Sequence, residues 1–203
     1  SRLVGSEMCI RDSSKSDLCS DLVGEYPELQ GVMGKYFALA QGFEEDVANS
    51  VSDHYLPIGL TSVLPKKPFS YSISIVDKID TLVGFFIIDE KPTSSKDPFA
   101  LRRAAIGLLR IIIENKLTFK LRDLISYAIR LYQEQGVEIK NEKTEQQVLE
   151  FIKERMRNVL KLKNIKNDVI EASISSHAGD NFLALYAKTV SYTHLTLPTS
   201  PPV

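Results

Sequence analysis

Residues 97–116 read DPFALRRAAIGLLRIIIENK, and this stretch decides the fold class. Its apolar residues recur every three or four positions, as one buried face of an α-helix requires. They are Leu101, Ala104, Ala105, Leu108, Leu109, Ile112 and Ile113. Asp97 can accept hydrogen bonds from the N–H groups of a first helical turn, and Pro98 suits the first helical position. The stretch predicts a long, half-buried helix whose N-terminus faces solvent.

The same spacing runs through most of the chain, whereas strand alternation is scarce. Helices are predicted near residues 17–24, 28–41, 44–55, 68–86, 97–116, 120–134, 144–162, 166–176 and 180–188. Residues 72–76 (SISIV) alternate like a strand, but the wider apolar spacing around them fits a helix. Long amphipathic helices joined by short loops favour an all-α helical bundle. Three glycines in helical surroundings are interpreted as close-packing positions: Gly24, Gly31 and Gly34.

The two ends of the chain look foreign to the rest. DNA that encodes MCIRDS at 8–13 has a reverse complement that encodes VSYTH, which stands at 190–194. Both ends also resemble translated sequencing adapters. We therefore expect residues 1–13 and 190–203 to be disordered, non-native tails. The interior is then an internal piece of a longer protein, predicted to comprise a helical core at 14–136 and a more solvated helical layer at 137–189.

The composition of the interior narrows the class of protein. It is long enough for one domain with a sizeable core. Cys19 is its lone cysteine, so an internal disulfide cannot form and a cytoplasmic location is expected. No run of about 18 apolar residues is present, which predicts no membrane span.

Two carboxylates are the first candidates for chemistry. Asp77 and Asp80 stand three residues apart, on one face of a mostly apolar helix. Unpaired carboxylates are costly to bury, so they need cations nearby. A structural ion-pair network, with Arg102 or Arg103 as the natural cations, is one interpretation, and a metal site is the other. Further metal ligands are scarce, because His54 is better explained as a partner for the last carbonyls of its helix.

Basic residues gather around the start of the helix at 97. Lys91 and Lys96 flank the preceding loop, and Arg103 and Arg110 follow on the helix. A basic loop beside a helix N-terminus suits phosphate groups and would bind RNA through its backbone. In the alternative, Arg110 pairs with Glu114 and both lysines are simply solvated. The formal net charge of −1 favours this alternative.

Several stretches together resemble the beta subunit of bacterial heterotetrameric glycyl-tRNA synthetases. They are DLVGEYPELQGVMGKYFA at 21–38, DHYLP at 53–57, VDKIDTLVGFF at 76–86, KPTSSKDPFALRRAAIGLLRIIIE at 91–114 and SSHAGDNFLALYAKT at 175–189. The resemblance spans essentially all of 14–189. It implies an HD-like helical module that precedes an anticodon-binding domain, which is missing here.

The resemblance also implies partners and an activity for the whole assembly. An alpha subunit would activate glycine with ATP, and the α2β2 heterotetramer would esterify it to tRNA(Gly). The fragment itself would hold no cofactor and no metal, would supply no catalytic residue, and would assist tRNA binding. The metal-binding His-Asp doublet of HD hydrolases has no match in this chain. A purely structural scaffold and a divergent HD-type phosphohydrolase are the alternative functions.

Overall fold

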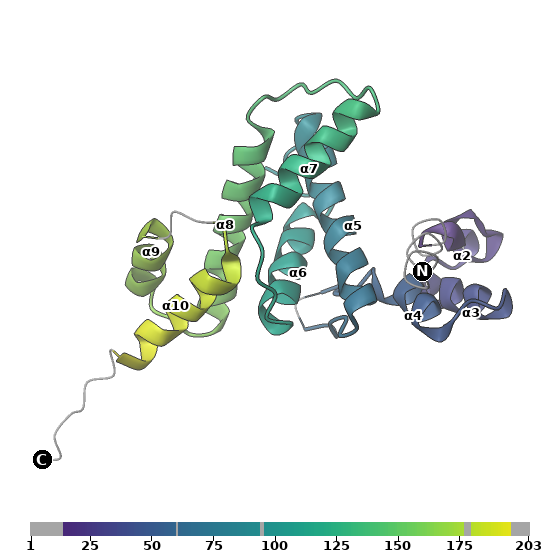
Figure 1. Cartoon of the computed structure of the whole chain (residues 1–203), viewed down its shortest axis with the longest axis horizontal. Coiled ribbons are helices and arrows are strands. Elements are labelled where there is room, and N and C mark those ends of the chain that lie inside the picture. Colours follow the sequence, from purple (N-terminus) through teal and green to yellow (C-terminus); the bar gives the residue numbers. More distant parts are fainter. Residues whose placement is uncertain (1–13, 60, 94–95, 177–179, 196–203) are drawn as a thin grey trace, which may run out of the picture. The chain divides into compact units, whose positions relative to one another are not determined.

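The computed structural model describes residues 14–59, 61–93, 96–176 and 180–195, and every regular element within them is a helix (Figure 1). The 3-10 helices are η1 (Ser16–Cys19) and η2 (Pro27–Leu29). The α-helices are α2 (Asp21–Glu25), α3 (Val32–Ala40), α4 (Glu45–Asp53), α5 (Pro68–Ile87), α6 (Leu101–Glu114), α7 (Leu121–Glu134), α8 (Thr144–Leu162), α9 (Asn167–Ser176) and α10 (Phe182–Leu195). The predicted all-α fold is confirmed.

The helix α5 settles the ambiguous stretch at 72–76, which is helical throughout. Its buried residues Ile75, Ile79 and Leu82 recur at helical spacing. None of the described helices is both long and apolar enough to cross a membrane.

The chain divides into two compact units, Ser1–Lys78 and Ile79–Val203. In the first unit, α3 packs mainly against α4. Gly34 of α3 is buried there, and so is Val51 of α4. The predicted close-packing role is confirmed for Gly31 and Gly34, because a Cβ atom at either would lie under 3.0 Å from a neighbouring side chain. It is wrong for Gly24, which has open space around it.

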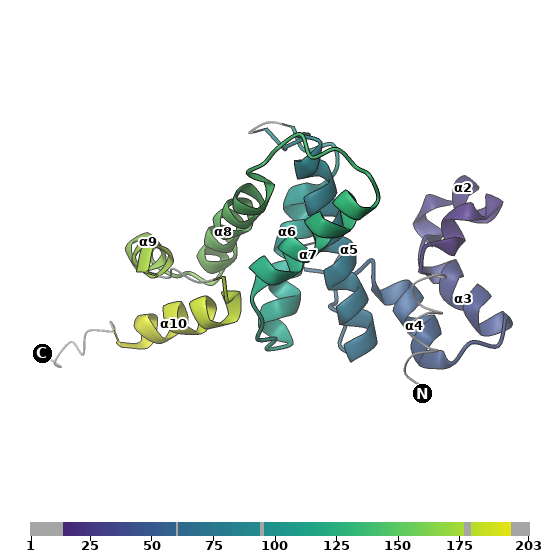
Figure 2. The ribbon, with the colours of Figure 1, turned by 45° about the horizontal axis from the view of Figure 1, so that its top comes forward.

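The second unit is built around α6, which packs against α8 and α10. The helix α9 packs against both α8 and α10, and it lies beside α10 in both views (Figure 1, Figure 2). The largest fully buried side chains of this core are Leu82, Ile87, Leu101, Leu108, Leu109, Ile111, Leu121, Ile125, Ile152, Met156, Leu160 and Ile170. The helix α8, which belongs to the predicted outer layer, also packs against α7. The division at residue 137 stays a prediction, as does the likeness to HD domains.

Several predicted helix ends differ from the structure. The predicted helices at 17–24 and 28–41 are each divided into a 3-10 helix and a shorter α-helix. The helix α6 begins at Leu101 rather than at Asp97, because Pro98 and Phe99 form a turn ahead of it. The helix α10 ends at Leu195 rather than at 188, so its last residues lie in the segment that the sequence assigned to a tail. No proline interrupts α10, since the first one after it is Pro198. Residues 1–13 and 196–203, which make up the rest of the predicted tails, lie outside the described residues.

Candidate functional site

The junction that leads into α6 is held by Asp97. Its Oδ1 accepts a hydrogen bond from the N–H of Leu101 at 2.8 Å, and its Oδ2 accepts one from the N–H of Arg102 at 3.0 Å. The carboxylate therefore caps the helix, as predicted, but from four residues before its start. Ala100 adopts a left-handed backbone with φ of 56°, which is uncommon for a residue other than glycine.

Replacing Asp97 by alanine is expected to lower the free energy of unfolding by about 1–2 kcal/mol, because two N–H groups lose their acceptor. Urea unfolding followed by far-ultraviolet circular dichroism measures this loss. The matched variant Asp97→Asn keeps one acceptor oxygen and should lose less. Equal stability of the wild-type chain and Asp97→Ala would show that water replaces the cap.

The four basic candidates at this junction form two groups, which differ in whether the side chain has a partner. Lys96 and Arg103 are exposed, and neither charged group has an ion-pair or hydrogen-bond partner among the described residues. Lys91 instead pairs with Asp89. The Arg110 side chain is only 16% exposed and lies 3.8 Å from a carboxylate oxygen of Glu114. Of these four residues, Lys96 and Arg103 are thus the two whose charges are available to an anionic ligand.

The predicted ion-pair residues have other partners in the structure. The guanidinium of Arg102 donates to the backbone carbonyl of Thr93, which ties the loop to the start of α6. Asp77 pairs with Lys15, whose Nζ lies 2.5 Å from Oδ1. Asp80 is exposed to solvent, so its carboxylate needs no buried cation. The pairing of these aspartates with Arg102 has no support from these contacts and stays a prediction.

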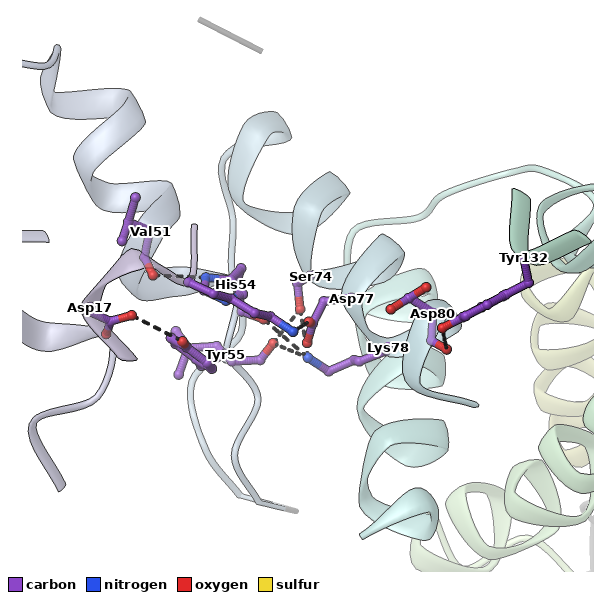
Figure 3. A network of polar contacts seen from close by, with 11 residues as sticks. Asp17, Val51, His54, Tyr55, Ser74, Asp77, Lys78, Asp80 and Tyr132 are labelled. Carbon is purple, nitrogen blue, oxygen red and sulfur yellow. Dashed lines mark hydrogen bonds and ion pairs between the residues drawn. The ribbon is translucent and has the colours of Figure 1, made fainter. Parts of the chain in front are cut away.

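A second polar cluster lies within the first unit, around Lys78 (Figure 3). Lys78 is only 5% exposed, and its Nζ donates to the carbonyl of Leu56 at 2.9 Å and to Oγ of Ser74 at 2.8 Å. The Ser74 hydroxyl donates to the same Leu56 carbonyl at 2.6 Å. Burial lowers the pKa of Lys78 to about 8. These bonds fasten the chain after α4 to α5.

His54 lies at the end of α4, where its Nδ1 is 2.8 Å from the carbonyl oxygen of Val51. The predicted role of His54, contact with the last carbonyls of its helix, is confirmed. The side chain is fully buried, and burial lowers its pKa. Its Nε2 has no hydrogen-bond partner among the described residues.

Asp17 is the structural residue that sequence reasoning missed most completely. It is 1% exposed, and its Oδ2 accepts a hydrogen bond from the N–H of Gly31 at 2.6 Å. The hydroxyl of Tyr55 donates to Oδ1 at 3.4 Å, and burial raises the pKa of Tyr55 to about 12. Nothing in the local sequence distinguishes Asp17 from the exposed Asp21, which stands in the next helix.

The two clusters suit different roles. The contacts of Asp17 and Lys78 join separate segments of the chain, and that of His54 lies at the end of its own helix, so this cluster stabilises the fold. Within the described ranges, no three His, Cys, Asp or Glu side chains gather closely enough to hold a metal ion. The junction ahead of α6 instead presents Lys96 and Arg103 to solvent, and it is the candidate surface for an anionic partner.

Comparison with known proteins gives concordant matches. The family model described as glycyl-tRNA synthetase beta subunit matches residues 10–175. A glycine–tRNA ligase beta subunit of Colwellia psychrerythraea is 46% identical over 162 residues, which are 80% of this chain and 23% of that protein. The corresponding subunit of Rickettsia canadensis is 44% identical over 166 residues, 82% of this chain and 24% of that protein. The chain spans about a quarter of the length of these curated relatives.

Proposed function

Because this chain belongs to the family of glycyl-tRNA synthetase beta subunits, we propose that it helps to hold tRNA(Gly) while the whole synthetase joins glycine to that tRNA at the expense of ATP. In this proposal the chain is a helical, non-catalytic part of a beta subunit in the cytoplasm. An alpha subunit is its partner in an α2β2 assembly and uses the ATP.

The observation that carries the proposal is the exposure of Lys96 and Arg103 on either side of the start of α6. Neither charge is neutralised by a described residue, whereas Lys91 is paired and Arg110 is largely covered. Exposed Lys and Arg side chains bind the phosphate groups of RNA. Such contacts position the RNA without recognising its sequence. The proposal therefore assigns Lys96 and Arg103 the contact with the tRNA backbone.

The test is tRNA(Gly) binding by the intact synthetase in which both Lys96 and Arg103 are replaced by alanine. We expect the affinity at low salt to fall about tenfold or more. The plot of log affinity against log salt concentration should also become shallower, by roughly 0.7–0.9 for each lost phosphate contact. Fluorescence anisotropy of labelled tRNA at several salt concentrations measures both quantities.

The matched control removes the same charge elsewhere in the second unit, with alanine at the exposed Lys120 and Lys163. This control should keep the wild-type affinity and salt dependence. If the Lys96/Arg103 variant and the wild-type synthetase bind tRNA(Gly) with equal affinity and equal salt dependence, the proposal that this junction contacts RNA is wrong.

A structural scaffold is the second candidate function, and the helix α3 favours it. Val32, Tyr36 and Leu39 are 48%, 58% and 39% exposed, and their spacing puts them along one side of α3. Apolar side chains gathered on one face of a helix are typical of protein contact surfaces. On this reading, the first unit contacts another part of the synthetase.

A further inference from the structure

The turn ahead of α6 presents an aromatic residue, Phe99, which stands between Lys96 and Arg103 in the sequence. Phe99 is 44% exposed, although phenylalanine is usually buried. Its ring stacks on that of Phe85, with centroids 4.0 Å apart and planes inclined by 21°. Phe85 thereby supports Phe99 from the side of α5, and Phe99 keeps nearly half of its surface open to solvent.

The backbone around Phe99 is fixed on both sides. The N–H of Ala100 bonds the carbonyl of Asp97 at 3.2 Å, and this turn is followed directly by the left-handed Ala100. A non-glycine residue in this conformation costs about 1 kcal/mol, so the surrounding contacts must hold it in place. The ring is therefore presented by an ordered turn.

Lys96 precedes Phe99 by three residues, and Arg103 follows it by four. The reach of the chain keeps their Cα atoms within about 14 Å of that of Phe99. Single-stranded RNA is bound by this combination, in which an aromatic ring stacks on a base and basic side chains contact the adjoining phosphates. A base inside a duplex is already stacked on both faces and offers no face to Phe99.

We infer that Phe99 stacks on an unpaired base of the RNA whose phosphates Lys96 and Arg103 contact. This inference rests on the proposed function and deepens it, because it specifies that the junction binds a non-duplex part of the tRNA. Stacking is tolerant of base identity, so the site selects unpaired structure rather than a particular nucleotide.

The test replaces Phe99 by leucine in the intact synthetase, which keeps an apolar side chain against Phe85 but removes the aromatic face. We expect the affinity for a tRNA(Gly) transcript to fall roughly five- to a hundredfold, with an unchanged salt slope, because no phosphate contact is lost. For a blunt RNA duplex without unpaired nucleotides, the same variant should bind as the wild-type synthetase does. The matched variant Phe99→Trp should keep or raise the affinity for tRNA.

The outcomes separate this inference from the proposal on which it rests. If Lys96/Arg103→Ala weakens binding and flattens the salt slope but Phe99→Leu does not weaken it, the stacking inference is wrong and the phosphate contacts stand. An equal loss for tRNA and for the duplex would also overturn it. A loss of alpha–beta assembly in Phe99→Leu, measured by size-exclusion chromatography, would make Phe99 a protein contact instead. Far-ultraviolet circular dichroism of each variant confirms folding.

Discussion

Replacing Gly34 by valine is expected to lower the free energy of unfolding of the chain by about 3 kcal/mol. Gly34 lies in α3, where a Cβ atom would stand 2.8 Å from Cγ1 of Val51 and 3.1 Å from Cβ of Asp17. Neither atom is the end of a long, flexible side chain, so the helices themselves must move apart. Replacing a glycine inside a helix by a residue with higher helix propensity stabilises the helix by up to about 1 kcal/mol. The cost of the steric overlap at Gly34 is larger than this gain.

Urea unfolding followed by far-ultraviolet circular dichroism measures this effect. The control is the same substitution at Gly24 of α2, where nothing lies within 4 Å of the added Cβ atom. Gly24→Val should change the stability by no more than about 0.5 kcal/mol. Similar losses at both positions would show that the loss at Gly34 is a general effect of valine and not a result of close helix packing.

The two glycines show why helices are easier to predict than their contacts. Both stand in helical surroundings in the sequence, yet only Gly34 faces another helix closely. Apolar spacing within a segment decides whether it is a helix, and it predicted both ends of α8 and the end of α7 correctly. The start of α6 was missed because Asp97 and Pro98 suit either a helix or the turn that precedes one.

The candidate site shows the same limit. Lys96 and Arg103 were selected from local sequence, because exposed basic residues beside a helix start need no distant partner. Asp17 and Lys78 were missed, because their partners Gly31 and Leu56 stand 14 and 22 residues away. The expectation for Asp77 and Asp80 assumed that both are buried, and helical spacing alone could not tell that Asp80 is exposed.

The second large effect is expected in the pH dependence of stability. Burial lowers the pKa of Lys78 from 10.5 to about 8, against the opposing charge of Asp77. In the unfolded chain Lys78 is solvated and recovers its ordinary pKa. Between pH 8 and 10.5 the unfolded chain therefore binds more protons than the folded chain, and the free energy of unfolding rises with pH. This stabilisation is complete above pH 10.5 and is lost as the pH falls through 8.

The variant Lys78→Met removes the amine and keeps an apolar stem in its place. The free energy of unfolding of the wild-type chain, relative to that of the variant, should rise by about 3 kcal/mol between pH 8 and 10.5. Urea unfolding at closely spaced pH values measures the difference. The pKa values of Tyr55 and Tyr132 are raised to about 12 in the folded chain. Above pH 10 both tyrosines therefore lower the free energy of unfolding, and they do so equally in the wild-type chain and the variant. The difference between the two profiles therefore isolates Lys78.

The control for Lys78 is the same substitution at the exposed Lys66 of the same unit, which should reproduce the wild-type profile. Parallel profiles of the wild-type chain and Lys78→Met would contradict the prediction, because they would require the Lys78 amine to be as well solvated in the folded chain as in the unfolded one. The bonds from its Nζ to the Leu56 carbonyl and Ser74 would then be broken in solution. Since those bonds fasten the chain after α4 to α5, that result would also remove the proposed role of this cluster in holding the first unit together.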